Sequence, residues 1–225
     1  MSSRLLPGSP ASPAGAPARR PGPGWPAGCD GRSASQSLNA TLAPRRSAII
    51  DFVRVRAAVE GDDVEAVARV HVESWRSTYP GLVPDDYLAG LSVERRADSW
   101  RRLIAETGAG RGVLVLEDDG DVIGFCHYGP SRDDDVDGTG EVTSIYLAAE
   151  WWRHGGGTQL LDAAVSAMTA AGYANATLWV LDGNDRARAF YEARGWVRDG
   201  AVKLDDQGPL QLRELRYVRA LDRAT

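Results

Sequence analysis

Three consecutive glycines, Gly155 to Gly157, separate an alternating apolar run from a run with helical spacing. The first run is Glu141 to Leu147, and the second continues to Ala171, where Gly172 is a typical helix stop. Glycine weakens the interiors of helices and strands, so three in a row indicate unusual backbone angles or the close approach of another group. The feature predicts a strand–turn–helix unit whose turn is either a flexible joint or a ligand site.

A helix that opens near Gly157 presents backbone N–H groups without partners inside the helix, and its dipole adds partial positive charge there. Such an end binds anions, including pyrophosphate, where no side chain blocks the approach. Two common nucleotide motifs do not fit. A P-loop needs a lysine after its last glycine, where Thr158 stands, and a dinucleotide fingerprint needs a third glycine, where Leu160 stands.

The remaining periodicities place this unit inside one mixed α/β domain. We expect a first strand at 52–59, a helix that starts after Asp62 as N-cap and breaks at Pro80, and a loop up to Ser92, which caps a second helix. The later elements are expected as strands at 112–118, 121–129, 141–147, 176–182, 196–204 and 210–218, with helices at 93–106, 157–171 and 184–194.

Residues 1–48 differ in composition from the rest of the chain. They hold eight of the twelve prolines and few branched apolar residues, so we predict that they are disordered and that the domain spans 49–225. The alternatives are a basic tether to an acidic partner, or a translation start further in. The segment has a formal charge of +5, which leaves −10 on the remainder. A folded part this acidic disfavours nucleic acid as the main partner.

The cysteines and histidines bear on the cellular compartment of the protein and on whether it binds a metal. Two cysteines, Cys29 and Cys126, make no disulfide framework, and no apolar run approaches the length of a membrane span, so we expect a cytoplasmic protein without a membrane partner. His127 and His154 lack metal-ligand spacing with Cys126, so no metal is expected. Cys126 itself is interpreted as a buried thiol in a strand.

Four stretches, in this order along the chain, resemble the GNAT superfamily of N-acetyltransferases over about residues 54–217. "SWRSTYPGLVPDDYL" is similar to the first helix and loop of some members, and "GEVTSIYL" to the strand before the glycine loop. The family's loop motif, Gln/Arg-x-x-Gly-x-Gly/Ala, is matched by Trp152, Gly155 and Gly157. A competing register, Arg153, Gly156 and Thr158, restores the arginine and loses the last small residue.

The fourth stretch, "NDRARAFYEARGW", resembles the later family motif of an asparagine followed by a helix that bears Phe-Tyr and ends in Gly-aromatic. The resemblance implies a largely antiparallel mixed sheet of six or seven strands with helices on both faces. It also implies acetyl-CoA as co-substrate and direct transfer of the acetyl group to a primary amine. The residues that it assigns to the cofactor are Ile145, Tyr146, Leu147, Trp152, Arg153, His154, Gly155, Gly156, Gly157, Thr158, Asn184 and Tyr191.

Two residues are candidates for proton transfer. The resemblance makes Tyr191 the general acid that protonates the departing thiolate; the alternative is a core tyrosine with a satisfied hydroxyl. Glu141 is the candidate base, acting through water, since it opens the strand that leads to the acyl site. The alternatives are an exposed carboxylate at the strand end and an amine that loses its proton in solution.

The amine that would accept the acetyl group is the part of the predicted function that the sequence constrains least. His71, Trp75 and Tyr79 form one stripe of the first helix, which in the family borders the acceptor site, although a stripe is more often core. Acidic residues at 85–86, 133–137 and 205–206 either are solvated loop tips or face the acceptor entrance, where they would favour a cationic amine on a small molecule or a peptide. Another acyl-CoA donor, a non-catalytic CoA-binding module, and a monomer or a homodimer all remain open.

Overall fold

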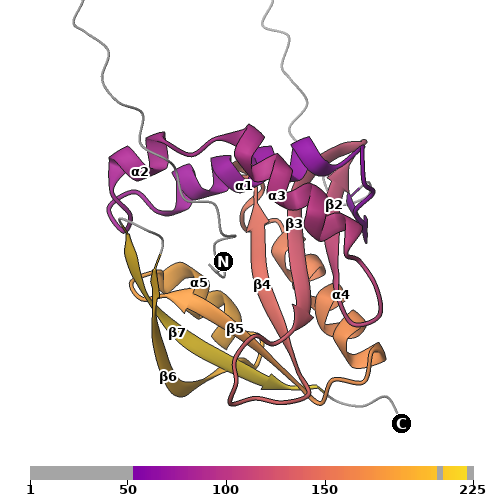
Figure 1. Cartoon of the computed structure of the whole chain (residues 1–225), viewed down its shortest axis with the longest axis vertical. Coiled ribbons are helices and arrows are strands. Elements are labelled where there is room, and N and C mark those ends of the chain that lie inside the picture. The colour runs from indigo at the N-terminus through magenta and orange to yellow at the C-terminus, as the bar shows by residue number, and fades with distance from the viewer. Residues whose placement is uncertain (1–52, 207–209, 222–225) are drawn as a thin grey trace, which may run out of the picture. The chain divides into compact units, whose positions relative to one another are not determined.

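The computed structural model describes residues 53–206 and 210–221. In this part of the chain seven strands form one sheet in the order β1-β2-β3-β4-β5-β7-β6 (Figure 1). The strands are β1 Val53–Ala57, β2 Gly112–Asp118, β3 Asp121–Pro130, β4 Thr139–Leu147, β5 Asn175–Leu181, β6 Val197–Asp206 and β7 Gln211–Ala220. The predicted mixed, largely antiparallel sheet is therefore confirmed. The disorder predicted for 1–48 lies outside the described residues.

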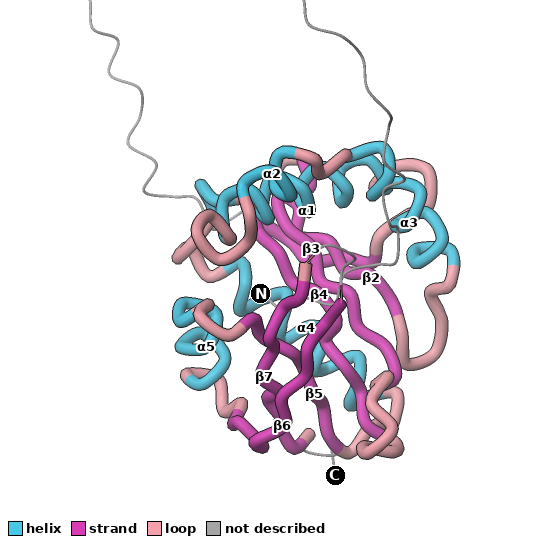
Figure 2. Tube along the Cα trace, turned by 60° about the vertical axis from the view of Figure 1, so that its left-hand side comes forward, coloured by secondary structure: helices cyan, strands magenta, loops and turns pink. Residues whose placement is uncertain are grey.

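Helices cover both faces of the sheet. They are α1 Val64–Thr78, α2 Asp85–Ala89, α3 Val93–Ala105, α4 Gly156–Ala170 and α5 Asp185–Glu192, with a 3₁₀ turn at Ala149–Trp151. Figure 2 shows α1, α2 and α3 gathered together, with α5 standing apart from them. One core cluster joins α1 and α3 to the face of β4 that carries Tyr146, and a second joins α4 and α5 to the face that carries Ile145.

The sequence predicted the cap of α3 correctly and the cap of α1 wrongly. Ser92 accepts a hydrogen bond from the Arg95 N–H and caps α3 as predicted. Asp62 was wrong as the cap of α1, because Asp63 occupies that position. The Asp63 carboxylate makes no capping hydrogen bond to the helix. It accepts hydrogen bonds from the Val59 N–H and from the Arg56 guanidinium, and the bond from Arg56 ties α1 to β1.

The segment predicted as a loop before Ser92 contains the short helix α2, which begins after Pro84. Proline leaves the start of a helix undisturbed, and Asp85 and Asp86 in the first turn complement the helix dipole. A five-residue helix shows too little periodicity to be recognised from the sequence.

The sheet opens between its two central strands. β4 and β5 run parallel and pair only from Thr139 to Val142 on β4 and from Asn175 to Leu178 on β5. Beyond this point β4 continues to Leu147 while β5 stays paired with β7, and β4 and β5 diverge (Figure 1). The end of β4 therefore has an open edge on the side of β5.

Candidate active site

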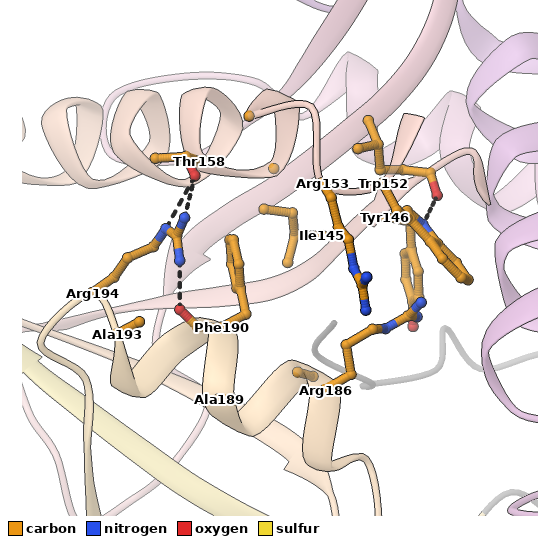
Figure 3. Close-up of a pocket in the computed structure, with 14 residues that line it drawn as sticks. Ile145, Tyr146, Trp152, Arg153, Thr158, Arg186, Ala189, Phe190, Ala193 and Arg194 are labelled. Carbon is orange, nitrogen blue, oxygen red and sulfur yellow. Dashed lines mark hydrogen bonds between the residues drawn. The ribbon is translucent and has the colours of Figure 1, made fainter. Parts of the chain in front are cut away.

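A pocket of about 550 Å³ lies where β4 diverges, between the start of α4 and one face of α5 (Figure 3). The predicted cofactor residues that line it are Ile145, Tyr146, Leu147, Trp152, Arg153, Gly155, Gly157 and Thr158. The other four predicted residues, His154, Gly156, Asn184 and Tyr191, are not part of its wall. Trp152 is fixed in the wall because its indole N–H donates to the Leu147 carbonyl at 2.9 Å.

Each of the three glycines of the loop is required for a different structural reason. Gly155 caps α4 with φ of 86°, a left-handed angle that side chains disfavour. Gly156 is buried, and a Cβ there would lie 2.5 Å from the Leu116 side chain, so this glycine allows the helix to pack on β2. A Cβ on Gly157 would meet only the Phe190 ring at 3.5 Å, on the pocket wall. Gly155 and Gly157 line the pocket, and so do Arg153 and Thr158 of the competing register, so the choice of register stays a prediction.

Asn184 lies between α5 and the interior of the protein. Its Oδ1 accepts a hydrogen bond from the Ala187 N–H and caps the helix, as predicted. Its Nδ2 is buried and has no hydrogen-bond partner in the described part of the chain. A buried amide donor without a partner is costly, so this group suits the carbonyl of a ligand bound beside Ala187, which lines the pocket.

Positive charge gathers on the pocket wall. Arg153, Arg186 and Arg194 all line it, and none of the described residues in its wall is acidic. Arg153 and Arg186 reach toward each other (Figure 3), and burial, together with the Arg153 charge, lowers the pKa of Arg186. Arg194 donates to the Thr158 hydroxyl at the other end of the pocket. In a chain with a net charge of −5, this concentration of guanidinium groups is suited to an anion such as a phosphate.

Sequence reasoning missed the contribution of α5 to this wall. Arg186, Phe190 and Arg194 follow one another at intervals of four and form one stripe of the helix and its end, with Ala189 and Ala193 between them. The interval was visible in the sequence and could have identified the stripe. The family motif itself names the Asn and Phe-Tyr positions and not these arginines.

Tyr191 points into the second core cluster and is fully buried. Its ring packs at 5.2 Å from that of Phe190, which lines the pocket, and at 6.2 Å from that of Trp196. The tyrosine is therefore one ring removed from the pocket wall. Its assignment as general acid stays a prediction.

Glu141 is also fully buried, at the start of β4. Its carboxylate accepts a hydrogen bond from the Arg132 N–H at 3.1 Å and from the Arg132 guanidinium at 3.0 Å. Arg132 lies in the loop that joins β3 to β4, so its bonds to Glu141 fix this loop against the start of β4. The exposed strand-end alternative is wrong, and the role of Glu141 as base stays a prediction.

The predicted acceptor stripe lies on the opposite side of β4 from α4. His71, Trp75 and Tyr79 are all buried on α1, in the core cluster that contains Tyr146. The Trp75 indole N–H donates to the Tyr146 hydroxyl at 2.9 Å, and the His71 ring stacks on the Tyr146 ring at 5.1 Å. Tyr146 thus connects this aromatic cluster with the pocket that it also lines.

The acidic loop before β4 is held by one arginine. Arg216 on β7, whose side chain is 8% exposed, donates to Asp135 through two bonds of 2.7 Å and to Asp199 at 2.6 Å. Asp133 lies 3.5 Å from the same guanidinium and accepts from the Trp179 indole. Two of the aspartates that favoured a cationic acceptor are therefore neutralised within the fold.

Three further predictions concern Cys126, His154 and the absence of a membrane span. Cys126 is buried as predicted, and burial raises the pKa of its thiol, which disfavours a reactive thiolate. His154 is exposed on the glycine loop, with its ring 6.4 Å from that of Trp151. None of the helices in the described residues is long and apolar enough to cross a membrane.

Comparison with known proteins agrees with this geometry. The model of the acetyltransferase (GNAT) family matches residues 69–196. The chain is 35% identical over 143 residues to the uncharacterized N-acetyltransferase YuaI of Bacillus subtilis (strain 168), a match that covers 63% of this chain and 79% of that protein.

Two solved structures share the fold. PaiA N-acetyltransferase from Thermoplasma acidophilum, in complex with coenzyme A, has 21% identity and a TM-score of 0.56, over 75% of this chain and 98% of that one. An N-acetyltransferase from Staphylococcus aureus Mu50 has 19% identity and a TM-score of 0.58, over 76% of this chain and 99% of that one.

Proposed function

The chain belongs to the GNAT acetyltransferase family, and we propose that it transfers an acetyl group from acetyl-CoA to a primary amine by direct attack in a ternary complex. The observation that carries this proposal is the opening between β4 and β5, with the pocket of about 550 Å³ on its α4 and α5 side. An extended ligand that enters there reaches the open edge of β4, which leads to the interior of the sheet.

The residues of the pocket fit coenzyme A. Backbone N–H groups at the start of α4 and the guanidinium groups of Arg153, Arg186 and Arg194 suit its phosphates. The open backbone edge of β4 and the Asn184 Nδ2 donor suit the amides of its pantetheine arm. The cofactor supplies the thioester whose acetyl group is transferred.

The chemistry needs an oriented amine and two proton transfers. The amine nitrogen forms a bond to the acetyl carbon, and the bond from that carbon to sulfur breaks, so the thiolate must take up a proton. A backbone N–H on the open edge of β4 polarises the thioester carbonyl, as oxyanion donors do. In this proposal Tyr191 protonates the thiolate. Glu141, held by Arg132, takes the proton of the amine through water.

The amine approaches from the face of the sheet that carries α1, α2 and α3, because the CoA pocket uses the other face. His71, Trp75 and Tyr79 line that route in this proposal, behind Tyr146. Positioning two reactants in this way supplies about 7–11 kcal/mol of the barrier reduction when the geometry is right. A different acyl-CoA would use the same residues.

A screen of amines tests the proposal. The full chain is incubated with acetyl-CoA and amines of several classes, free thiol is followed in time, and acetylated products are identified by mass. Thiol release that depends on the amine supports the acetyltransferase. Tight binding of acetyl-CoA without release for any amine would support the alternative, a CoA-binding module.

A further inference from the structure

Lys203 on β6 is the only lysine in the sequence; the other members of the 26 basic residues are arginines. Its Nζ lies 2.8 Å from Glu214 Oε2 and 4.3 Å from the centre of the Trp179 ring. The Glu214 side chain is fully buried, and that of Lys203 is 17% exposed. An arginine keeps its proton in proteins, whereas a lysine amine can lose it and become a nucleophile. The one side-chain amine of the sequence is therefore held in a largely buried ion pair.

The register of the strands directs the Lys203 side chain toward the opening between β4 and β5. Lys203 pairs with Glu214 on β7, which pairs in turn with Leu181 on β5. From β6 the Lys203 Nζ reaches across β7 to the ring of Trp179, which belongs to β5. Trp179 directly follows Leu178, the last residue of β5 that pairs with β4. The amine therefore lies beside the part of β5 that diverges from β4.

The amine also lies on the face of the sheet from which the acceptor approaches in the proposed function. Side chains two positions apart on a strand point to the same face, so Trp179 and Leu181 share one. Leu181 packs in the core cluster that contains Tyr146 and Tyr79, on the α1 side of the sheet. A primary amine of the chain thus occupies the side of the opening that an external acceptor must reach.

We infer that the chain acetylates its own Lys203, an inference that rests on the proposed acetyltransferase function. The Lys203 Nζ forms a bond to the acetyl carbon of acetyl-CoA, and the bond from that carbon to sulfur breaks. Nζ starts as an ammonium and ends as an amide, so it loses two protons. Glu214 takes the first proton before the attack, and the second ends on the sulfur, which leaves as the thiol of coenzyme A.

Glu214 suits the role of proton acceptor for this amine. It is the carboxylate nearest to Nζ among the printed contacts of Lys203, and it is fully buried. Removing two opposite charges from water is costly, and transfer of one proton from the ammonium to the carboxylate makes both groups neutral. The same burial that holds the pair together therefore favours the form of the lysine that can attack a thioester.

Mass spectrometry of the full chain tests the inference. The chain is incubated with acetyl-CoA and no added amine, its intact mass is followed in time, and peptide mapping identifies the acetylated position. We expect one acetyl group on Lys203, with a rate constant that does not depend on the concentration of the chain. The chain unfolded in urea gives the uncatalysed rate with acetyl-CoA, and the folded chain should exceed it by at least about 100-fold.

Variants assign the reaction to the site. Glu214→Gln should lower the rate constant by about 10²–10⁴-fold, because the base is removed, and leave the Kd of acetyl-CoA unchanged, which also shows that the variant is folded. Glu214→Asp keeps a carboxylate and should recover part of the rate. Glu73→Gln, at an exposed position of α1, is the matched control and should react like the unaltered chain. Gly157→Val, which blocks the proposed phosphate site, should react only at the uncatalysed rate.

The outcomes separate this inference from the proposed function. Acetylation of added amines with no acetyl group on Lys203 would overturn the inference and leave the acetyltransferase proposal standing. Lys203 that reacts as fast in the unfolded chain or in Gly157→Val would also overturn it, because the lysine would then react without the site. An unchanged rate constant in Glu214→Gln would overturn the role of Glu214. Bound acetyl-CoA with no acetylation of Lys203 or of any amine would overturn both proposals.

Discussion

The guanidinium of Arg186 lies 3.5 Å above the indole ring of Trp152. The contact joins the first turn of α5 to the glycine loop across the mouth of the pocket, and both residues line it. Cation–π contacts of this kind contribute about 0.5–2 kcal/mol. Two elements that are distant in the sequence are therefore held at the spacing that the pocket requires.

Replacing Arg186 by Gln should weaken acetyl-CoA binding by about tenfold, or about 1.4 kcal/mol, because it removes both a positive charge and this contact. Calorimetric titration of the full chain with acetyl-CoA measures the change. The matched control is Arg188→Gln on the same helix, whose guanidinium bonds Asp185 and Tyr217 away from the pocket. Equal losses for the two variants would mean that Arg186 acts only through the net charge.

Two neighbouring glycines should respond to substitution in opposite ways. Gly157→Val places a branched side chain on the pocket wall, so it should abolish the rise in Tm that acetyl-CoA produces and leave the unliganded Tm nearly unchanged. Gly156→Ala places a methyl 2.5 Å from the Leu116 side chain, so it should cost about 1–3 kcal/mol of stability. It should keep the rise with ligand.

Thermal unfolding with and without acetyl-CoA separates the two effects. A ligand that binds only the folded protein adds about 2.7 kcal/mol at a hundredfold excess over its Kd. If Gly157→Val binds acetyl-CoA as the unaltered chain does, the loop is a joint and not a phosphate site.

Tyr191→Phe should lower kcat by about 10²–10⁴-fold and change the Kd of acetyl-CoA little, because it removes one hydroxyl that is needed as the thiolate leaves. The measurement is single-turnover acetylation with saturating donor, so that the chemical step is observed. Tyr173→Phe, outside the pocket wall, is the control. An unchanged chemical step would return Tyr191 to the alternative of a core residue, for which its complete burial is sufficient explanation.

Signals that act within a few residues were readable from the sequence. The caps at Ser92 and Asn184, the glycine loop and the strand of Glu141 all follow from local hydrogen bonding and periodicity. Asp62 was wrong as a cap because the neighbouring aspartate is held by bonds from outside the helix. Arg56, on the neighbouring strand, fixes Asp63 instead.

The parts of the site that could not be predicted depend on contacts between distant segments. The divergence of β4 from β5 is a property of their pairing, which stops at Val142 and Leu178 without any break in either strand's sequence pattern. The acidic residues that pair with buried arginines are also distant from them in the sequence. Arg216 meets aspartates about eighty positions away, and Arg56 meets Glu117 about sixty positions away. Both appear in the sequence as ordinary charged residues.

The last prediction concerns pH and the half-buried His127 on β3. Burial, with the charges of Arg132 and Arg111, lowers the pKa of His127 to about 4, against about 6.5 in the unfolded chain. Between these values the unfolded state binds the proton and the folded state does not. The free energy of unfolding should therefore be highest above pH 6.5 and fall by about 3 kcal/mol as the pH drops to 4. Burial lowers the pKa of His71 as well, which adds to the slope.

Urea unfolding at steps between pH 7.5 and 4 measures this slope. The carboxylates whose pKa values are lowered by arginines, Asp63 and Glu117 among them, begin to lose their contribution only below about pH 5, so the part of the curve between pH 7.5 and about 5 belongs to the histidines. His127→Gln should flatten the curve, while His154→Gln, at an exposed position, serves as the matched control. A slope that persists unchanged in His127→Gln would show that the pKa of this ring is the same in the folded and the unfolded protein, and would assign the pH dependence to other groups.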